Sequence, residues 1–294
     1  MLVSGRSPHH FLVPDHQRGD ARDGELVKLE ITEYPQAQTE AQGRVVAVLG
    51  QSGDPGMATA VAIEQFALPS EFPRPVVTAA EAWGSQVRPT DKTGREDLRD
   101  LALVTIDGAD ARDFDDAVFA EPAGDGWRVI VAIADVSYYV QPDDLIDREA
   151  RQRGTSVYFP DRVVPMLPES LSNGLCSLNP KVDRLCMVCD MRIGKSGKVE
   201  RSRFFRGLMR SAARLTYDQV DEYQRTGEGK AVVRRVGDSI AHLYDVFRVL
   251  SAARRRRGAL DLDLPEVKIE LDEKGQVARV QPRPRNDAHR LIEV

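Results

Sequence analysis

The sequence predicts an α+β protein in which a small β-rich unit precedes a larger unit of mixed strands and helices. Two short alternating segments bounded by glycines lie within residues 24–50, and longer apolar strands surround a glycine turn within residues 101–134. Apolar side chains recur at helical spacing within residues 239–257. The 294 residues, 41% of them hydrophobic and 30% charged, suit a globular chain of one large domain or two smaller ones.

Net charge and segment composition limit the classes of function. The formal net charge is −5, so the chain as a whole lacks the basic character that announces nucleic-acid binding. No segment is long and apolar enough for a membrane span, and residues 1–20 lack the apolar centre of a secretory signal. We therefore expect a cytoplasmic protein without a membrane partner.

The first unit contains two predicted strands. Gly24–Thr32 alternates between apolar and polar side chains, as in a half-buried strand, and Gly43–Gly50 predicts a second strand. Ala58–Phe66 fits either a third strand or a short helix. Few strands with turn-rich connections indicate a small β-barrel of the oligonucleotide-binding type, and a purely structural β-module is the alternative.

A proline-rich stretch, Pro69–Pro75, ends this unit because each proline disfavours helix in the residue before it. We predict a first domain over residues 1–75, a linker over 76–100 with a helical turn near Ala79–Trp83, and a second domain over 101–294.

The second unit alternates hairpins with helices. Strands are predicted over residues 101–106, 117–121, 127–134, 185–193, 198–205, 267–271 and 276–281, and helices over 147–153, 239–257 and 286–293. Thr216 and Asn286 are placed as helix N-caps. The helix over 239–257 ends in four arginines, Arg254–Arg257, which either match the helix dipole as solvated charge or form an RNA-binding patch.

The three cysteines are predicted to be core thiols. Cys186 and Cys189 lie three positions apart in a predicted strand, so their side chains point to opposite faces. No second pair of cysteines or histidines completes a zinc site with them.

Four aspartates with the spacing D-x5-D-x-D-D stand out at the end of an apolar strand: Asp107, Asp113, Asp115 and Asp116. Carboxylates this close repel one another unless cations neutralise them. Hard cations such as Mg²⁺ prefer oxygen ligands, and a pair of such ions catalyses phosphodiester hydrolysis in many nucleases. A solvated acidic loop is the alternative, whereas a calcium loop is excluded because no D-x-[DN]-x-[DN]-G run is followed by a glutamate at its twelfth position.

A longer series of segments carries a family resemblance. The segments are T-I-D-G-x-D-A-R-D-F-D-D-A-V (105–118), V-A-I-A-D-V-S-Y-Y-V (131–140), D-R-E-A-R-x-R-G-T-S-V-Y-F-P (147–160), P-M-L-P-E-x-L-S-N-G-L-C-S-L (165–178) and D-R-L-C-M-V (183–188). Their order resembles the catalytic domain of the ribonuclease II / ribonuclease R family, and D-A-R-D-F-D-D resembles its ribonuclease R branch. The match runs with few gaps from Leu101 to Glu293.

The resemblance implies a fold and a partial length. It implies the later part of a cold-shock-like β-barrel over the first domain and the first half of a mixed α/β ribonuclease catalytic domain after it. The family normally continues beyond Val294, so we expect a truncated product or one part of a split enzyme.

The resemblance also implies an activity, which is Mg²⁺-dependent 3′-to-5′ hydrolysis of single-stranded RNA to nucleoside 5′-monophosphates. It implies two Mg²⁺ ions, no small-molecule cofactor and a monomer. Asp107 and Asp116 are implied as direct ligands, with Asp113 and Asp115 completing the site. Asp115 and Asp116 are the expected catalytic residues, and Asp115→Asn is expected to abolish cleavage with the least loss of binding.

Four further residues are predicted to contact RNA: Tyr158, Tyr217, Arg112 and Arg153. By resemblance, Tyr158 holds the 3′-terminal nucleotide and Tyr217 approaches the ribose. Core packing of Tyr158, a surface position for Tyr217 and helical i,i+4 ion pairing around Arg153 remain open as alternatives. Leu262 takes the position of a stacking phenylalanine in the family, which puts that stacking contact in doubt.

Two other functions remain open. The first is an RNA-binding module without catalysis, in which the aspartates are intact but the active site is incomplete. The second is a phosphatase-like metalloenzyme that acts on small phosphoesters and ignores RNA.

Overall fold

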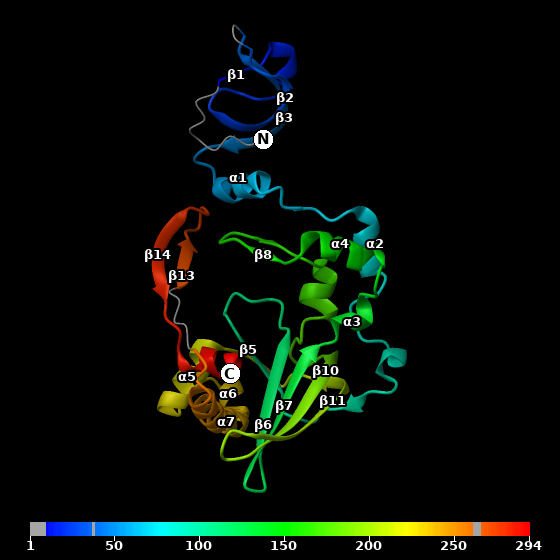
Figure 1. Cartoon of the computed structure of the whole chain (residues 1–294), viewed down its shortest axis with the longest axis vertical. Coiled ribbons are helices and arrows are strands. Elements are labelled where there is room, and N and C mark those ends of the chain that lie inside the picture. The colour runs from blue at the N-terminus through cyan, green and yellow to red at the C-terminus, as the bar shows by residue number, and fades with distance from the viewer. Residues whose placement is uncertain (1–9, 37–38, 261–265) are drawn as a thin grey trace. The chain divides into compact units, whose positions relative to one another are not determined.

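The computed structural model describes residues 10–36, 39–260 and 266–294, and the chain divides into two compact units (Figure 1). The first unit consists of Met1–Phe72, Arg153–Met166 and Val267–Pro282. The second consists of Pro73–Gln152, Leu167–Glu266 and Arg283–Val294. The domain boundaries at residues 75 and 100 remain a prediction.

The first unit contains a three-stranded sheet in the order β1-β3-β2. Its strands are β1 (Phe11–Leu12), β2 (Glu25–Glu33) and β3 (Ala41–Gln51), with the short helical turn η1 (Asp15–Gln17) between β1 and β2. Strands β2 and β3 pair antiparallel, and β1 pairs parallel to β3. The two predicted strands are therefore confirmed.

Helix α1 (Met57–Gln65) follows the sheet and resolves the choice between strand and helix over Ala58–Phe66. Its buried side chains Thr59 and Ile63 lie four positions apart, a spacing that places both on one side of a helix. The hydroxyl of Thr59 donates to Asp161 at 2.6 Å and so joins α1 to a hairpin of the same unit. That hairpin pairs β8 (Val157–Tyr158) with β9 (Val163–Val164).

A second hairpin of the first unit, β13 (Glu266–Leu271) with β14 (Val277–Arg283), agrees with its prediction. Leu262, whose role in stacking was left in doubt, lies outside the described residues.

The second unit is built on a seven-stranded mixed sheet. In spatial order its strands are β12 (Ala213–Thr216), β5 (Val104–Asp107), β6 (Asp116–Ala123), β7 (Gly126–Ala134), β10 (Asp183–Ile193), β11 (Val199–Arg210) and β4 (Glu96–Asp97). The two outer strands pair in parallel with their neighbours, and the inner pairs are antiparallel. The hairpins β6–β7 and β10–β11 were predicted from alternation and turn residues and are confirmed.

Helices and helical turns complete the second unit. They are α2 (Arg74–Glu81), η2 (Pro89–Lys92), α3 (Val136–Tyr139), α4 (Leu145–Arg153), η3 (Ser170–Leu175), α5 (Tyr217–Thr226), α6 (Ala231–Arg235), α7 (Gly237–Arg256) and α8 (Asp287–Glu293). Helix α2 begins at Arg74, earlier than the predicted turn at Ala79–Trp83, because a proline is tolerated in the first helical turn.

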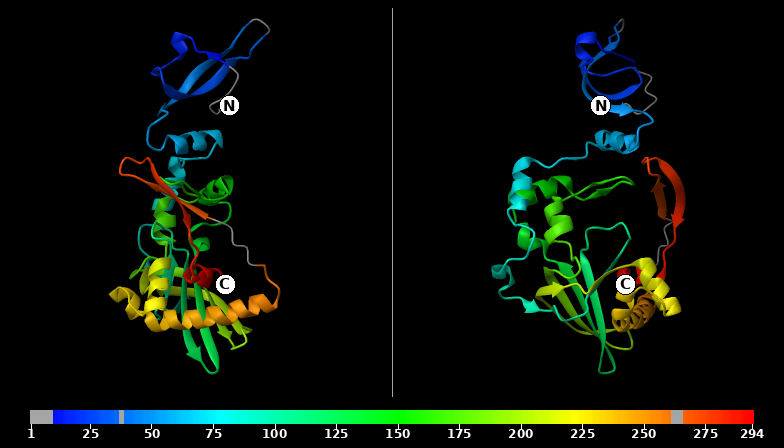
Figure 2. Two further views of the ribbon diagram at one scale, coloured as in Figure 1. Left: turned by 90° about the vertical axis from the view of Figure 1, so that its left-hand side faces the viewer. Right: turned by 180° about the vertical axis from the view of Figure 1, so that it is seen from behind.

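The main core of this unit lies between the sheet and helices α5–α8. Helix α7 crosses β6, as the left view of Figure 2 shows along the length of the helix. Buried side chains from both layers meet there, and they include Ile106, Val118, Leu215, Ile240 and Leu291. Burial of this apolar surface stabilises the end of the sheet that carries the aspartates.

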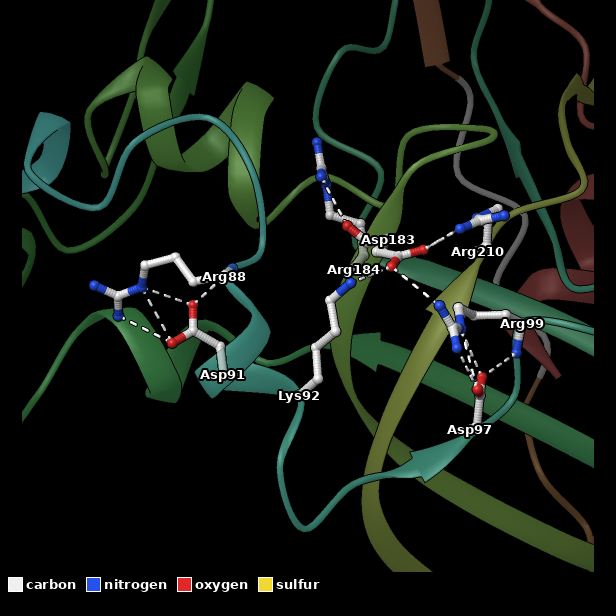
Figure 3. Close-up of polar contacts among 8 residues, drawn as sticks. All are labelled: Arg88, Asp91, Lys92, Asp97, Arg99, Asp183, Arg184 and Arg210. Carbon is white, nitrogen blue, oxygen red and sulfur yellow. Dashed lines mark hydrogen bonds and ion pairs between the residues drawn. The ribbon is translucent and has the colours of Figure 1, made fainter.

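An ion-pair network fixes the segment before β5 (Figure 3). Asp183, at the start of β10, accepts from Lys92 and from Arg210 at 2.7 Å each, and Arg99 lies 3.4 Å away. Burial alone raises the pKa of Asp183, but the hydrogen bonds from Lys92 and Arg210 outweigh it and lower that pKa. One carboxylate therefore joins η2, β11 and the residues that follow β4.

The cysteines are free thiols, as predicted. Cys176 and Cys186 are buried and Cys189 is half-buried. Burial raises the pKa of Cys176 and of Cys186 to about 12, so neither carries the thiolate that metal binding or redox chemistry requires. In the part of the chain that the structure describes, no helix is both long enough and apolar enough to cross a lipid bilayer.

Candidate functional site

The aspartate motif lies at one end of the large sheet. Asp107 is the last residue of β5 and Asp116 is the first residue of β6, and these two strands are antiparallel neighbours. Asp113 and Asp115 lie in the connection between them. The strand pairing therefore brings both ends of the motif to one edge, as its position between two apolar strands predicts.

Arg214 of β12 holds the first half of this connection. Because β12 pairs in parallel with β5, Arg214 lies opposite Thr105 in the register. Its guanidinium donates to the backbone oxygens of Ala109 at 2.8 Å and Ala111 at 3.1 Å. Its central carbon lies 4.8 Å from the ring centre of Phe114, a cation–π contact.

Ser177 holds the second half of the connection. The buried Ser177 hydroxyl accepts from the amide of Phe114 at 3.0 Å and donates to the oxygen of Arg112 at 2.9 Å. Two more backbone bonds follow, from Leu178 to the Phe114 oxygen and from Ala134 to the Asp115 oxygen, each 2.8 Å long. The residues between the carboxylates are therefore fixed by main-chain contacts on both sides of Phe114.

Burial and mutual repulsion act on the carboxylates themselves. Desolvation, followed by the negative charge of Asp116, raises the pKa of Asp107 to about 6. Asp115 is exposed at the surface, yet partial desolvation and the charges of Asp113 and Asp116 raise its pKa. Desolvation also raises the pKa of Asp116. The group disfavours its own negative charge, as expected of carboxylates that a cation normally accompanies.

One carboxylate oxygen lacks a partner. The Oδ2 atom of Asp107 is buried and accepts no hydrogen bond from any described residue. Buried polar atoms without partners are uncommon and costly, and an ion or an ordered water is a usual explanation. Even so, no group of three or more aspartate, glutamate, histidine or cysteine side chains within residues 10–36, 39–260 and 266–294 is arranged to hold a metal ion. The structure supplies an acidic edge with one unsatisfied ligand atom.

Tyr217 lies beside this acidic edge. Thr216, the N-cap of α5, pairs with Asp107 in the β12–β5 register, so Tyr217 directly follows the residue opposite Asp107. Desolvation and then the charges of Asp107 and Asp116 raise the pKa of the Tyr217 phenol. The ring of Tyr217 stacks on that of His289 from α8. The structure therefore places Tyr217 beside the aspartates, and its contact with the ribose stays a prediction.

The other predicted RNA contacts divide between the units. Arg112 is exposed in the aspartate connection of the second unit. Tyr158 and Arg153 belong to the first unit. Tyr158 is 62% exposed, so the core-aromatic alternative is wrong. Arg153 donates to the oxygens of Glu71 at 2.7 Å and Pro165 at 3.1 Å, and it lies over the ring of Phe72 at 3.5 Å.

Sequence reasoning assigned no role to Ser177, Arg214 or His289. Ser177 lies inside one of the segments that carry the family resemblance, whereas Arg214 and His289 lie only within the wider match from Leu101 to Glu293. The ion pair between Arg151 and Asp147 at 2.9 Å shows that i,i+4 pairing does occur in α4.

Comparison with known proteins gives two family matches. A profile described as the RNB domain matches residues 95–294, and a profile described as a cold shock domain matches residues 3–73. The fold is therefore a cold shock domain followed by an RNB domain of mixed α/β structure.

Individual relatives share one name. A protein named ribonuclease R from Vibrio parahaemolyticus is 47% identical over 98% of this chain, and one from Escherichia coli is 46% identical over 96% of it. Each match covers 35% of the relative, so the chain spans about a third of the length of these curated proteins.

A solved structure agrees with them. Mycoplasma genitalium RNase R in complex with ribose-methylated single-stranded RNA superposes with a TM-score of 0.90 at 29% identity. This match covers 97% of the present chain and 45% of that one.

Proposed function

Because the chain belongs to the RNB domain family, we propose that it carries the carboxylate site of a 3′-to-5′ exoribonuclease. The substrate is single-stranded RNA, and the products are nucleoside 5′-monophosphates. One observation supports this above the others, namely the edge where burial and mutual repulsion raise the pKa of Asp107, Asp115 and Asp116. The relatives named ribonuclease R and the neighbour bound to single-stranded RNA support the choice of substrate.

The carboxylates of this edge are ligands of the kind that Mg²⁺ prefers, although no three of them within the described residues are arranged to hold an ion as they stand. Carboxylate oxygens are the ligands that this ion prefers, and the buried Oδ2 of Asp107 lacks any other described partner. We assign Asp107 and Asp116 as direct ligands of two ions, with Asp113 and Asp115 completing the set. When bound, the ions supply Lewis-acid activation of a water and of the scissile phosphodiester.

The side chains of this chain position the reacting groups. Asp115 is the exposed member of the acidic edge, and we assign its carboxylate to orient the attacking water. The backbone contacts of Ser177 and Arg214 hold the connection that carries Asp113 and Asp115. A rigid connection keeps the carboxylates in place as RNA binds, which favours the reacting geometry.

Four residues are assigned to the RNA strand. The Tyr217 phenol lies beside the acidic edge, where it can contact the terminal 2′-hydroxyl and favour RNA over DNA. The exposed ring of Tyr158 offers a stacking surface for the terminal base. Arg112 and Arg153 are assigned to backbone phosphates.

We also propose a domain organisation for the chain. Residues 1–75 form the oligonucleotide-binding domain, 76–100 connect it, and 101–294 form the catalytic domain, in keeping with the profile matches over 3–73 and 95–294. We further propose a cytoplasmic monomer that uses no small-molecule cofactor besides Mg²⁺.

The test is hydrolysis of a 5′-labelled single-stranded RNA by the purified chain in Mg²⁺. We expect a ladder that shortens from the 3′ end, with release of 5′-monophosphates. Both are lost in EDTA and in the Asp115→Asn variant. A strand that stays intact in Mg²⁺ contradicts the activity.

A second function is favoured by one observation. Within the described residues no three ligand side chains are arranged to hold an ion, as expected of an RNA-binding module that lacks part of its active site. Binding of the same RNA without a ladder supports this module. Hydrolysis of small phosphoesters without any action on RNA supports the phosphatase-like alternative instead.

A further inference from the structure

The acidic edge poses an electrostatic problem for an RNA ligand. Asp107, Asp113, Asp115 and Asp116 lie at or between the ends of two adjacent strands, and the phosphodiester that must approach them is also negative. Metal ions neutralise part of this charge, but a cationic side chain at the edge would hold the phosphate directly. Besides Arg112, which is already assigned to backbone phosphates, two arginines of the second unit lie near enough to consider, Arg214 and Arg283.

Arg214 is already engaged by the protein. Its Nη2 atom donates to two backbone oxygens, those of Ala109 and Ala111, and its guanidinium covers the ring of Phe114. Its Nε atom is buried without a partner among the described residues. Moving this guanidinium toward RNA would release the aspartate connection, so Arg214 is a positioning residue.

Arg283 reaches the same connection from the end of β14. Its Nη2 atom lies 3.1 Å from the place where a Cβ on Gly108 would be, and Gly108 directly follows Asp107. The absence of a side chain at Gly108 therefore gives the guanidinium room beside the acidic edge. Asp110 flanks the same place, with its Oδ1 atom 2.9 Å from it.

The charge of Arg283 acts on the residues of the site. Burial raises the pKa of Tyr217, and the charge of Arg283 partly offsets that rise. Burial lowers the pKa of His289, and the charge of Arg283 lowers it further. The side chain is exposed, and no carboxylate of a described residue pairs with it within ion-pair distance. An exposed guanidinium that forms no ion pair with a described residue, beside an acidic edge, is suited to bind a phosphate in two-point fashion.

We propose that Arg283 binds the terminal phosphodiester of the RNA strand and so draws the scissile phosphate to the carboxylates. This assignment rests on the proposed function, because it gives the acidic edge an RNA ligand. Arg283 thereby contacts the substrate, whereas Arg214 holds the aspartate connection in place.

The test compares charge removal on the protein with charge removal on the ligand. The probes are short, 5′-labelled, fully ribose-methylated RNA strands, which prevents attack by a neighbouring 2′-hydroxyl. One probe has ordinary linkages, a second has a neutral methylphosphonate at the last linkage, and a third has it at an internal linkage. Binding in Mg²⁺ is measured by fluorescence anisotropy for wild type, Arg283→Gln, Arg283→Lys and the control Arg225→Gln.

Arg225 is a matched control because it is an exposed arginine of α5, so its substitution removes the same charge from the same unit. For wild type we expect the neutral last linkage to weaken binding by about tenfold, as loss of a charge-assisted contact does. Arg283→Gln should bind the ordinary strand about tenfold more weakly and should lose clearly less than wild type at the neutral last linkage, because only the contact of that linkage with bound Mg²⁺ remains to be lost. The neutral internal linkage should weaken wild type and Arg283→Gln equally, Arg225→Gln should behave as wild type, and Arg283→Lys should recover part of the affinity.

Two results would overturn the assignment. The first is additive loss, in which Arg283→Gln remains as sensitive to the neutral last linkage as wild type. The second is a wild type that does not bind the strands or does not sense the last linkage. Release of 5′-monophosphates from unmethylated RNA separates the two proposals: release with additive losses removes only the role of Arg283, whereas coupling without release removes only the nuclease activity.

Discussion

The rings of Tyr217 and His289 lie face to face, with centroids 3.9 Å apart and planes inclined by 20°. Tyr217 begins α5, and His289 lies in α8, where its Nδ1 atom is 2.7 Å from the Oδ1 atom of the N-cap Asn286. Asn286, the N-cap of α8, therefore orients the His289 ring, and this ring stacks on Tyr217, the first residue of α5. Through this stack, α8 acts on a side chain beside the aspartates.

Loss of the His289 ring should weaken the preference of the protein for RNA with a ribose at its 3′ end over a strand with a 2′-deoxyribose there. Under the proposed function, Tyr217 contacts the terminal 2′-hydroxyl, and an aromatic stack of this kind contributes about 0.5–1.5 kcal/mol. We expect His289→Ala to reduce the preference for a ribose over a 2′-deoxyribose 3′ end by about threefold to tenfold. His289→Phe keeps a ring and should retain most of the preference. Competition binding with the two strands measures it, and full preference in His289→Ala would contradict the role of the stack.

Removing the charge of Asp107 should stabilise the fold at neutral pH. The pKa of Asp107 is about 6 in the folded chain against an ordinary value of 3.8, so folding favours its protonated form. The stability that this group contributes is complete below pH 3.8 and is lost as the pH rises through about 6. In EDTA at pH 7, Asp107→Asn should therefore be about 1–3 kcal/mol more stable than wild type, with little difference at pH 4.

Urea unfolding at the two pH values measures this difference. Asp110→Asn, an exposed carboxylate in the same connection, serves as the control and should show no comparable gain at pH 7. Adding Mg²⁺ should raise the unfolding midpoint of wild type more than that of Asp107→Asn, because binding to the folded state alone stabilises it. A less stable Asp107→Asn at pH 7 would show that this carboxylate is not under electrostatic stress.

Asp115→Asn should separate catalysis from binding. The substitution keeps the size of the side chain and removes one charge from an exposed position in the acidic edge. We expect cleavage of single-stranded RNA to fall by more than about a hundredfold, while affinity changes by less than about threefold. Asp125→Asn, in the turn between β6 and β7, is the control and should cleave as wild type does. Equal losses of affinity and cleavage in Asp115→Asn would instead assign Asp115 to RNA binding.

Ser177→Ala should loosen the connection that carries the aspartates. It leaves the buried amide of Phe114 and the oxygen of Arg112 without their partner, at a cost of about 1–3 kcal/mol. Hydrogen exchange followed by mass spectrometry should show that Ser177→Ala accelerates exchange relative to wild type, and that this acceleration is larger over residues 108–116 than over the β10–β11 hairpin. Ser172→Ala is the control, since its hydroxyl makes a long, 3.5 Å contact with Leu167. Unchanged exchange over 108–116 would mean that other contacts suffice.

Local patterns in the sequence predicted most elements of the fold. Alternation placed β2, whereas apolar runs bounded by turn residues placed β3, β6, β7, β10 and β11, and the capping residues Thr216 and Asn286 marked the starts of α5 and α8. Segment 58–66 stayed ambiguous because a short apolar run fits both periodicities. Arg74 was missed as a helix start because prolines on both sides argue for an extended chain, although the first helical turn accepts a proline.

The sequence predicted the aspartates of the site but not the residues that hold or orient its side chains. Asp107 and Asp116 share a short segment with a distinctive spacing, so the sequence alone brings them together. Arg214 and Ser177 reach that segment through parallel strand pairing and a buried hydroxyl, and His289 stacks on Tyr217 beside it. Contacts between distant positions leave no periodic signal, which is why composition and spacing did not reveal them.

The parallel pairing of β12 with β5 also sets an order of events during translation. The acidic connection leaves the ribosome first, Arg214 and Tyr217 emerge much later, and His289 emerges last. Pairings between such distant positions form slowly, because a long loop must close before any contact rewards it. A nascent chain that ends before α8 therefore contains the aspartates, Arg214 and Tyr217 but lacks the His289 ring on which Tyr217 stacks.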